Sequence, residues 1–190
     1  MLPVKNAIRN FVNDEGGSLL AELVIVLPVL VWSYFALFVY WDAFRSMNTV
    51  QKAAYTISDT ISREMKTFSP TYVDGLRNVM DYMLDDDQDV KLRLTSITFD
   101  EDEDKYIVMW SYSPGNDMPK MTNGMLDDLE FRIPDMADSD YATILETEVP
   151  YVPIFNVGMG DQNLTQFIVT RPRFVSPNCL TGEICTYEGS

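Results

Sequence analysis

The hydrophobic residues of this 190-residue chain are concentrated near its N-terminus. Residues 19–41 (LLAELVIVLPVLVWSYFALFVYW) contain a single ionisable side chain, that of Glu22. A bilayer core of about 30 Å is spanned by about 20 apolar residues in a helix. A proline such as Pro28 bends a membrane helix without ending it. The pattern therefore predicts a membrane-spanning helix, with a buried core helix and a cleaved secretory signal as the alternatives.

The end of the apolar segment argues against a cleaved secretory signal. Such a signal has an apolar region of about 7–15 residues followed by a small-x-small cleavage site. The segment here is longer, and its end (FVYWDAFRSM) offers no such site. We therefore expect the segment to be retained. The terminal amine, Lys5 and Arg9 outnumber Arg45 and Lys52 on the other flank by one, which favours a cytoplasmic N-terminus.

The chain after the apolar segment begins with a helical pattern. Apolar residues recur at steps of three and four across residues 44–65, as on one face of an amphipathic helix. One helix is therefore expected to run unbroken over residues 18–66, half in the membrane and half outside. Ser69 and Pro70 form a cap and first-turn pair, which predicts a second helix that ends at the acidic run 85–89.

The remainder of the chain has the alternating pattern of strands. An irregular alternation near Ser96 predicts a bulge, and Pro150 places the end of its strand towards a sheet edge. The fold class predicted is α+β, with the two helices followed by a small antiparallel sheet. Strands are expected at residues 90–99, 105–113, 141–151 and 164–174, with a loop containing one helical turn at residues 114–140.

Composition removes several classes of function. With 14 Lys and Arg against 29 Asp and Glu, the net charge of −15 argues against nucleic-acid binding. The absence of His removes the usual catalytic base and the commonest zinc ligand. The acidic runs 85–89 and 100–104 lack the glycine and the terminal glutamate of an EF-hand. We therefore predict no catalytic residue, no metal site and no cofactor, and we expect a non-enzymatic protein.

Glu22 is the residue that the membrane interpretation leaves unexplained. A carboxylate costs on the order of 2.5–3.5 kcal/mol at the centre of a membrane, and less near its edge. The next basic residue along the chain is Arg45, which is far away along the helix axis. The partner of the Glu22 carboxylate must therefore be a proton, a lipid headgroup or a cation that is created after synthesis.

The residues around Glu22 resemble a known N-terminal signal. The stretch FVNDEGGSLLAELVIVLPVLVWSYF is similar to the N-terminus of TadE/TadF-like minor pilins (pseudopilins) of the tight-adherence type IV pilus system. The matching positions are Asp14, Glu15, Gly17, Glu22, Leu27 and Pro28. The resemblance implies that a prepilin peptidase cleaves between Gly17 and Ser18, so that Glu22 becomes the fifth residue of the mature chain.

The resemblance also implies a pilin-like organisation. Residues 1–17 would be a cytoplasmic leader, residues 18–41 a transmembrane or pilus-core helix, and residues 42–190 an extracytoplasmic head. The partners implied are other pilins or pseudopilins, the prepilin peptidase, the inner-membrane assembly platform and the membrane itself. The expected location is the bacterial inner membrane, with a periplasmic head, or the pilus. The alternative function is a single-pass anchor that carries a small binding or enzymatic domain.

The two cysteines lie close together near the C-terminus. Cys179 and Cys185 bracket five residues that include Gly182, a spacing that a small hairpin can close. In a short exported domain such a pair favours a disulfide over free thiols.

Overall fold

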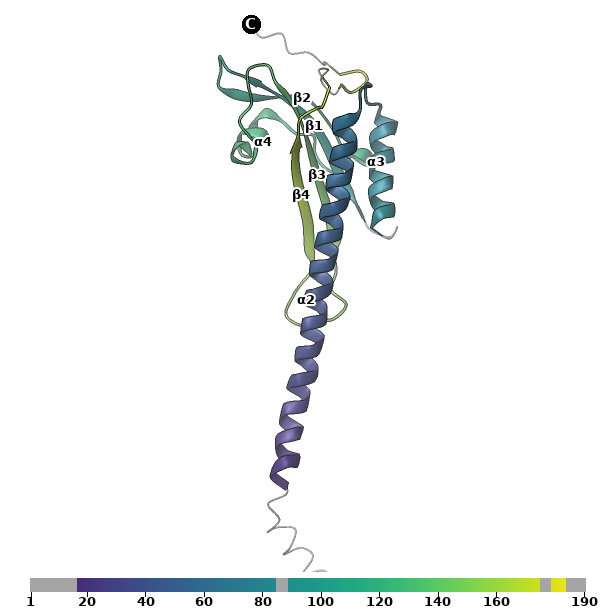
Figure 1. Cartoon of the computed structure of the whole chain (residues 1–190), viewed down its shortest axis with the longest axis vertical. Helices are drawn as coiled ribbons and strands as arrows, with labels where there is room; N and C mark the ends of the chain where they lie inside the picture. Colours follow the sequence, from purple (N-terminus) through teal and green to yellow (C-terminus); the bar gives the residue numbers. More distant parts are fainter. Residues whose placement is uncertain (1–16, 85–88, 175–178, 184–190) are drawn as a thin grey trace, which may run out of the picture. The chain divides into compact units, whose positions relative to one another are not determined.

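In the part of the chain that the structure describes, two helices are followed by a four-stranded antiparallel sheet (Figure 1). The computed structural model describes residues 17–84, 89–174 and 179–183. These residues fall into two compact units, of which the first holds the chain up to Ala43 together with Pro153–Gly160. The second holds Phe44–Val152 and the chain from Asp161 onwards. The predicted α+β fold class is confirmed.

The long N-terminal helix is present almost as predicted. Helix α2 spans Gly17–Arg63, with Pro28 inside it. It ends three residues before the predicted position, because the chain must turn there to reach Ser69, the N-cap of the next helix. From Phe44 onwards its buried positions recur at steps of three and four, and they are Val50, Ala53, Ala54, Ile57, Ser58, Ile61 and Ser62.

The second helix, α3, also matches the prediction. It spans Pro70–Met83, and the Tyr72 N–H donates to the Ser69 hydroxyl oxygen at 3.1 Å. Proline suits this first position because its missing N–H would have no partner within the helix. The acidic run at 85–88, where this helix was expected to end, lies outside the described residues.

The sheet has the strand order β2-β1-β3-β4, and every neighbouring pair is antiparallel. The register between β1 and β2 shifts between Ser96 and Ile97, which confirms the predicted bulge. The bounds of the strands are Lys91–Asp100 for β1, Lys105–Tyr112 for β2, Tyr141–Tyr151 for β3 and Gln162–Thr170 for β4.

Two details of the sheet could be seen only in the structure and not in the sequence. Strand β4 ends at Thr170 instead of residue 174, because Pro172 cannot donate to a ladder and the Arg173 N–H donates to the Ser62 carbonyl of α2 at 2.9 Å. Strand β3 is internal, but its pairing with β1 stops at Glu148. Pro150 therefore has only β4 beside it, which is a locally open edge.

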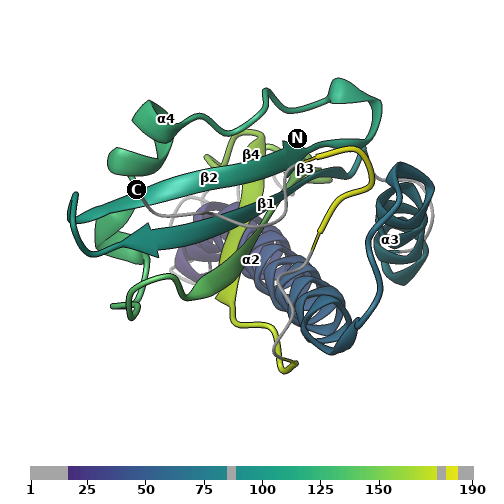
Figure 2. The ribbon, with the colours of Figure 1, turned by 90° about the horizontal axis from the view of Figure 1, so that it is seen from above.

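Both faces of the sheet are covered (Figure 2). The second half of α2 and α3 lie on one face, where the Phe68 ring stacks on Tyr72 and meets Trp110 edge to face. The segment between β2 and β3 begins with the 3-10 turn η1 (Pro114–Asn116), which contacts α3. Its later part, with the short helix α4 (Asn123–Asp127) and the 3-10 turn η2 (Glu130–Arg132), covers the other face. The core on this face consists of Ile97, Tyr106, Leu126, Ile133, Met136, Ala142 and Ile144.

A buried ion pair holds this second layer to the sheet. The Arg93 guanidinium donates to both carboxylate oxygens of Glu146 at 2.7 and 2.8 Å, and to the Pro119 carbonyl at 2.6 Å. The two side chains are only 5% and 12% exposed. The next pair along the same two strands, Lys91 and Glu148, is more open to solvent.

We predict that Glu146→Ala destabilises the head by about 3–5 kcal/mol, because it leaves the Arg93 charge buried without its partner. Thermal unfolding of the full chain in detergent micelles, followed by near-ultraviolet circular dichroism, measures the loss. Glu148→Ala, on the same strand, is the control and should cost no more than about 1 kcal/mol. Equal losses in the two variants would contradict the prediction.

Candidate functional site

The first half of α2 exposes a continuous apolar surface. The helix is long and apolar enough to cross a membrane, and only 11% of its most apolar stretch is buried. A core helix of a soluble protein would be mostly covered, so burial within this chain does not account for the segment. The exposed large side chains include Leu23, Val24, Ile25, Leu27, Leu30, Trp32, Tyr34, Leu37, Tyr40, Trp41 and Phe44.

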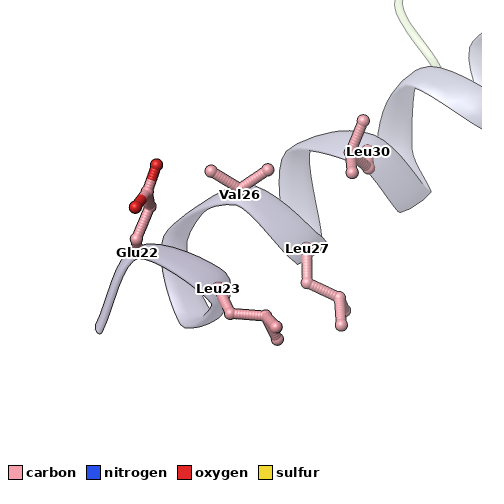
Figure 3. A pocket seen from close by; sticks show the side chains of 5 residues that line it. All are labelled: Glu22, Leu23, Val26, Leu27 and Leu30. Atoms are coloured by element: carbon pink, nitrogen blue, oxygen red, sulfur yellow. The ribbon is translucent and has the colours of Figure 1, made fainter. Parts of the chain in front are cut away.

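Glu22 lies at the beginning of this surface (Figure 3). Its carboxylate is exposed and lies on the same side of the helix as Val26 and Leu30, while Leu23 and Leu27 point to another side. None of the residues that the structure describes forms an ion pair with Glu22. Arg45 follows 23 residues later, which is about 34 Å along a helix axis, so the two charges cannot meet on one chain.

The surface next to Glu22 has the form of a groove. A hollow of about 490 Å³ is lined by Glu22, Leu23, Val26, Leu27 and Leu30. All of its walls come from one helix, so it cannot enclose a small ligand as a cavity does. Rows of side chains at i and i+4 with a groove between them are the surface into which a second helix packs. The geometry thus favours another helix, or lipid chains, over a soluble small molecule.

The predicted cleavage position lies at the N-terminal end of the described part of helix α2. Gly17 is the first residue of α2, and Ser18 follows it. Glu22 is four residues after Ser18, which places the two on one helix face about 6 Å apart along the axis. The structure therefore brings three of the predicted site residues into the first turns of one helix.

The predicted cysteine pair is described only in part. The Cys179 carbonyl accepts from the Phe68 N–H at 2.7 Å, and the Thr181 N–H donates to the Phe68 carbonyl at 2.8 Å. These bonds join the segment 179–183 to the connection between α2 and α3. Cys185 lies outside the described residues, so the disulfide stays a prediction.

The charged groups of the head are used in structural contacts. In a hollow of about 380 Å³ between α2 and β4, Asp59 accepts from Arg63 at 2.9 Å and from Arg173 at 2.6 Å. Burial, and then the hydrogen bond to Asp74, raises the pKa of the Tyr112 hydroxyl, so this group stays protonated at neutral pH. In the described parts of the chain, no three acidic or cysteine side chains come together as a metal site.

One contact of the apolar helix was not anticipated from the sequence. The loop Pro153–Gly160, between β3 and β4, belongs to the same compact unit as the first part of α2. The rings of Phe155 and Phe35 lie 4.9 Å apart, and Ile154 is exposed. The signal that could have indicated this loop is the absence of any charged residue between Glu148 and Asp161.

Comparisons of the chain with protein-family models, with curated proteins and with solved structures found no match. What the chain does must therefore be argued from the long apolar helix and from Glu22.

We predict that Leu30→Arg weakens stable membrane integration. An arginine at the centre of a spanning helix costs about 2.5–3.5 kcal/mol on insertion scales, and Leu30 is near the middle of the apolar surface. Alkaline carbonate extraction of membranes that contain the full chain measures integration. Gln51→Arg, at an exposed position of the same helix beyond the apolar stretch, is the control and should stay in the pellet. Extraction of the unmodified chain by carbonate would contradict a membrane-spanning helix at residues 19–41, and equal retention of the two variants would contradict a central position for Leu30 in the bilayer.

Proposed function

We propose that this chain is a TadE/TadF-like minor pilin, or pseudopilin, of a Tad-type pilus. It would take part in the assembly or initiation of the pilus, or form part of its tip. The observation that carries the proposal is Glu22, an exposed carboxylate near the start of an apolar helix, with no partner among the described residues. The leader would be removed after Gly17, five residues before Glu22.

Cleavage after Gly17 would create the partner that Glu22 lacks. The new α-amine of Ser18 is a cation close to the membrane face. When mature helices pack side by side in a dry array, the amine of one chain and the Glu22 carboxylate of a neighbour neutralise each other. Leaving either charge buried without its partner commonly costs about 3–5 kcal/mol, so the pair would select one axial register between subunits.

The proposal defines partners and a location. The prepilin peptidase acts on the leader, other pilins or pseudopilins pack against α2, and the inner-membrane assembly platform receives the processed subunit. The N-terminus would lie in the cytoplasm and the head in the periplasm. A disulfide between Cys179 and Cys185 would fit this compartment, because the periplasm is oxidising.

The second candidate function is a single-pass anchor that carries a small extracytoplasmic binding or enzymatic domain. It uses the same apolar helix. It differs in its N-terminus, which would stay intact, and in having no use for the carboxylate of Glu22.

We predict that the protein purified from its native membrane begins at Ser18. The intact mass should be lower by roughly 2 kDa, the mass of a 17-residue leader. Gly17→Leu should block processing and keep the full mass, because the peptidase would meet a bulky side chain at the cut. An unmodified chain that begins at Met1 would leave only the anchor function.

We predict further that Glu22→Gln is processed normally but fails to assemble with other pilins. The amide keeps the size of the side chain and removes the charge that pairs with the new amine. Cross-linking in membranes, with pilus yield as a second readout, measures assembly. Glu22→Asp is the matched control, since it keeps the charge and should retain part of the activity. Full assembly by Glu22→Gln would contradict the pairing.

A further inference from the structure

A second apolar element accompanies the membrane helix. The loop Pro153–Gly160 shares a compact unit with the first part of α2, and its Phe155 ring contacts the ring of Phe35. On the same loop Val157 is buried, whereas Ile154 is 65% exposed and Phe155 42% exposed. The loop thus has an inner face that packs and an outer face of large apolar side chains.

The composition of the loop differs from that of the rest of the chain after residue 41. No charged residue occurs between Glu148 and Asp161, although the chain carries 29 acidic and 14 basic residues. Exposed segments of soluble domains are normally polar, and contiguous exposed apolar groups mark a surface that binds something apolar. Because Phe155 of the loop contacts Phe35 on the apolar part of α2, the same medium is expected to cover both.

The level of the contact along α2 fits the outer boundary of a bilayer. Phe35 follows Ser18 by 17 residues, which is about 26 Å along a helix in a hydrocarbon core of about 30 Å. Trp41, which would lie at the interface, is about 9 Å further along the axis. Phe155 would therefore lie about 4–9 Å below the boundary, which is the depth of groups that insert from the surface.

The loop also satisfies part of its own backbone. The Gly158 N–H donates to the Asn156 side-chain oxygen at 3.3 Å, and Gly158 has a φ of +102°, which favours glycine. A turn of this kind lowers the cost of placing a non-helical backbone at the boundary, where unsatisfied N–H groups are expensive.

We propose that the β3–β4 loop inserts Ile154 and Phe155 into the outer leaflet beside α2, so that the chain holds the membrane at two points. The partner is lipid, at the boundary between headgroups and acyl chains. The inference rests on α2 spanning a bilayer, which the pilin and the anchor functions share. It adds a second membrane contact, from the loop, to that of the spanning helix.

Electron paramagnetic resonance of a nitroxide at Ile154→Cys tests the proposal. The full chain is reconstituted in vesicles of phosphatidylethanolamine and phosphatidylglycerol, and collisions with oxygen and with a water-soluble nickel chelate are compared. Leu30→Cys is the reference for lipid exposure, and Asp102→Cys in the β1–β2 turn is the reference for water. The parent chain, carried through the same labelling, gives the signal from Cys179 and Cys185. Met159→Cys is a second probe if the first variant does not fold.

The expected result is an oxygen-to-nickel collision ratio at Ile154 that is several-fold above that at Asp102 and approaches that at Leu30. A ratio equal to that at Asp102 would overturn the proposal, because the loop would then be in water. Low collision rates with both reagents would also overturn it, since a second protein chain would then cover the loop. The identity of the N-terminal residue is measured separately, so failure here leaves the proposed function intact.

Discussion

The uncovered apolar surface of α2 is the constraint on which the rest of the structure depends. From Leu23 to Phe44 one large hydrophobic side chain after another is exposed. Burial of each is worth about 1.5–3 kcal/mol, so the surface must be covered by lipid or by other helices. Within the described chain little covers this surface, since Val39 is its one fully buried residue and the buried stripe beyond Phe44 begins at Val50. The pattern of α2 therefore changes near Phe44, from an exposed apolar surface to a single buried stripe.

The elements that local patterns specify could be predicted closely. The three- and four-residue steps beyond Phe44 come from one helix face against one sheet, and Ser69 with Pro70 fixes the start of α3 through a cap that involves only neighbouring residues. The bulge near Ser96 was visible because a single extra residue reverses the alternation of a strand. Glu22 was likewise visible as a charge in an apolar run.

The features that were missed depend on residues far apart in the sequence. Strand β4 ends early because Arg173 bonds to Ser62 of α2 more than a hundred residues away. The Arg93–Glu146 pair needs the register of β1 against β3, which alternation alone does not determine. The contact of the loop at Phe155 with Phe35 joins residues 120 positions apart. The loop's lack of charge was visible, but nothing in a local window indicated what the loop contacts.

Energetic grounds favour the proposed assembling function over the anchor function, and they rest on Glu22. A helix that only anchors a domain gains nothing from a carboxylate in its apolar stretch, and the carboxylate costs free energy in proportion to its depth. A helix that joins an array of identical helices gains specificity from the same group, because each wrong register leaves a buried charge without a partner. The cost in the isolated chain and the gain in the array thus arise from one property, the low dielectric around α2. Only the assembling function turns that cost into an advantage.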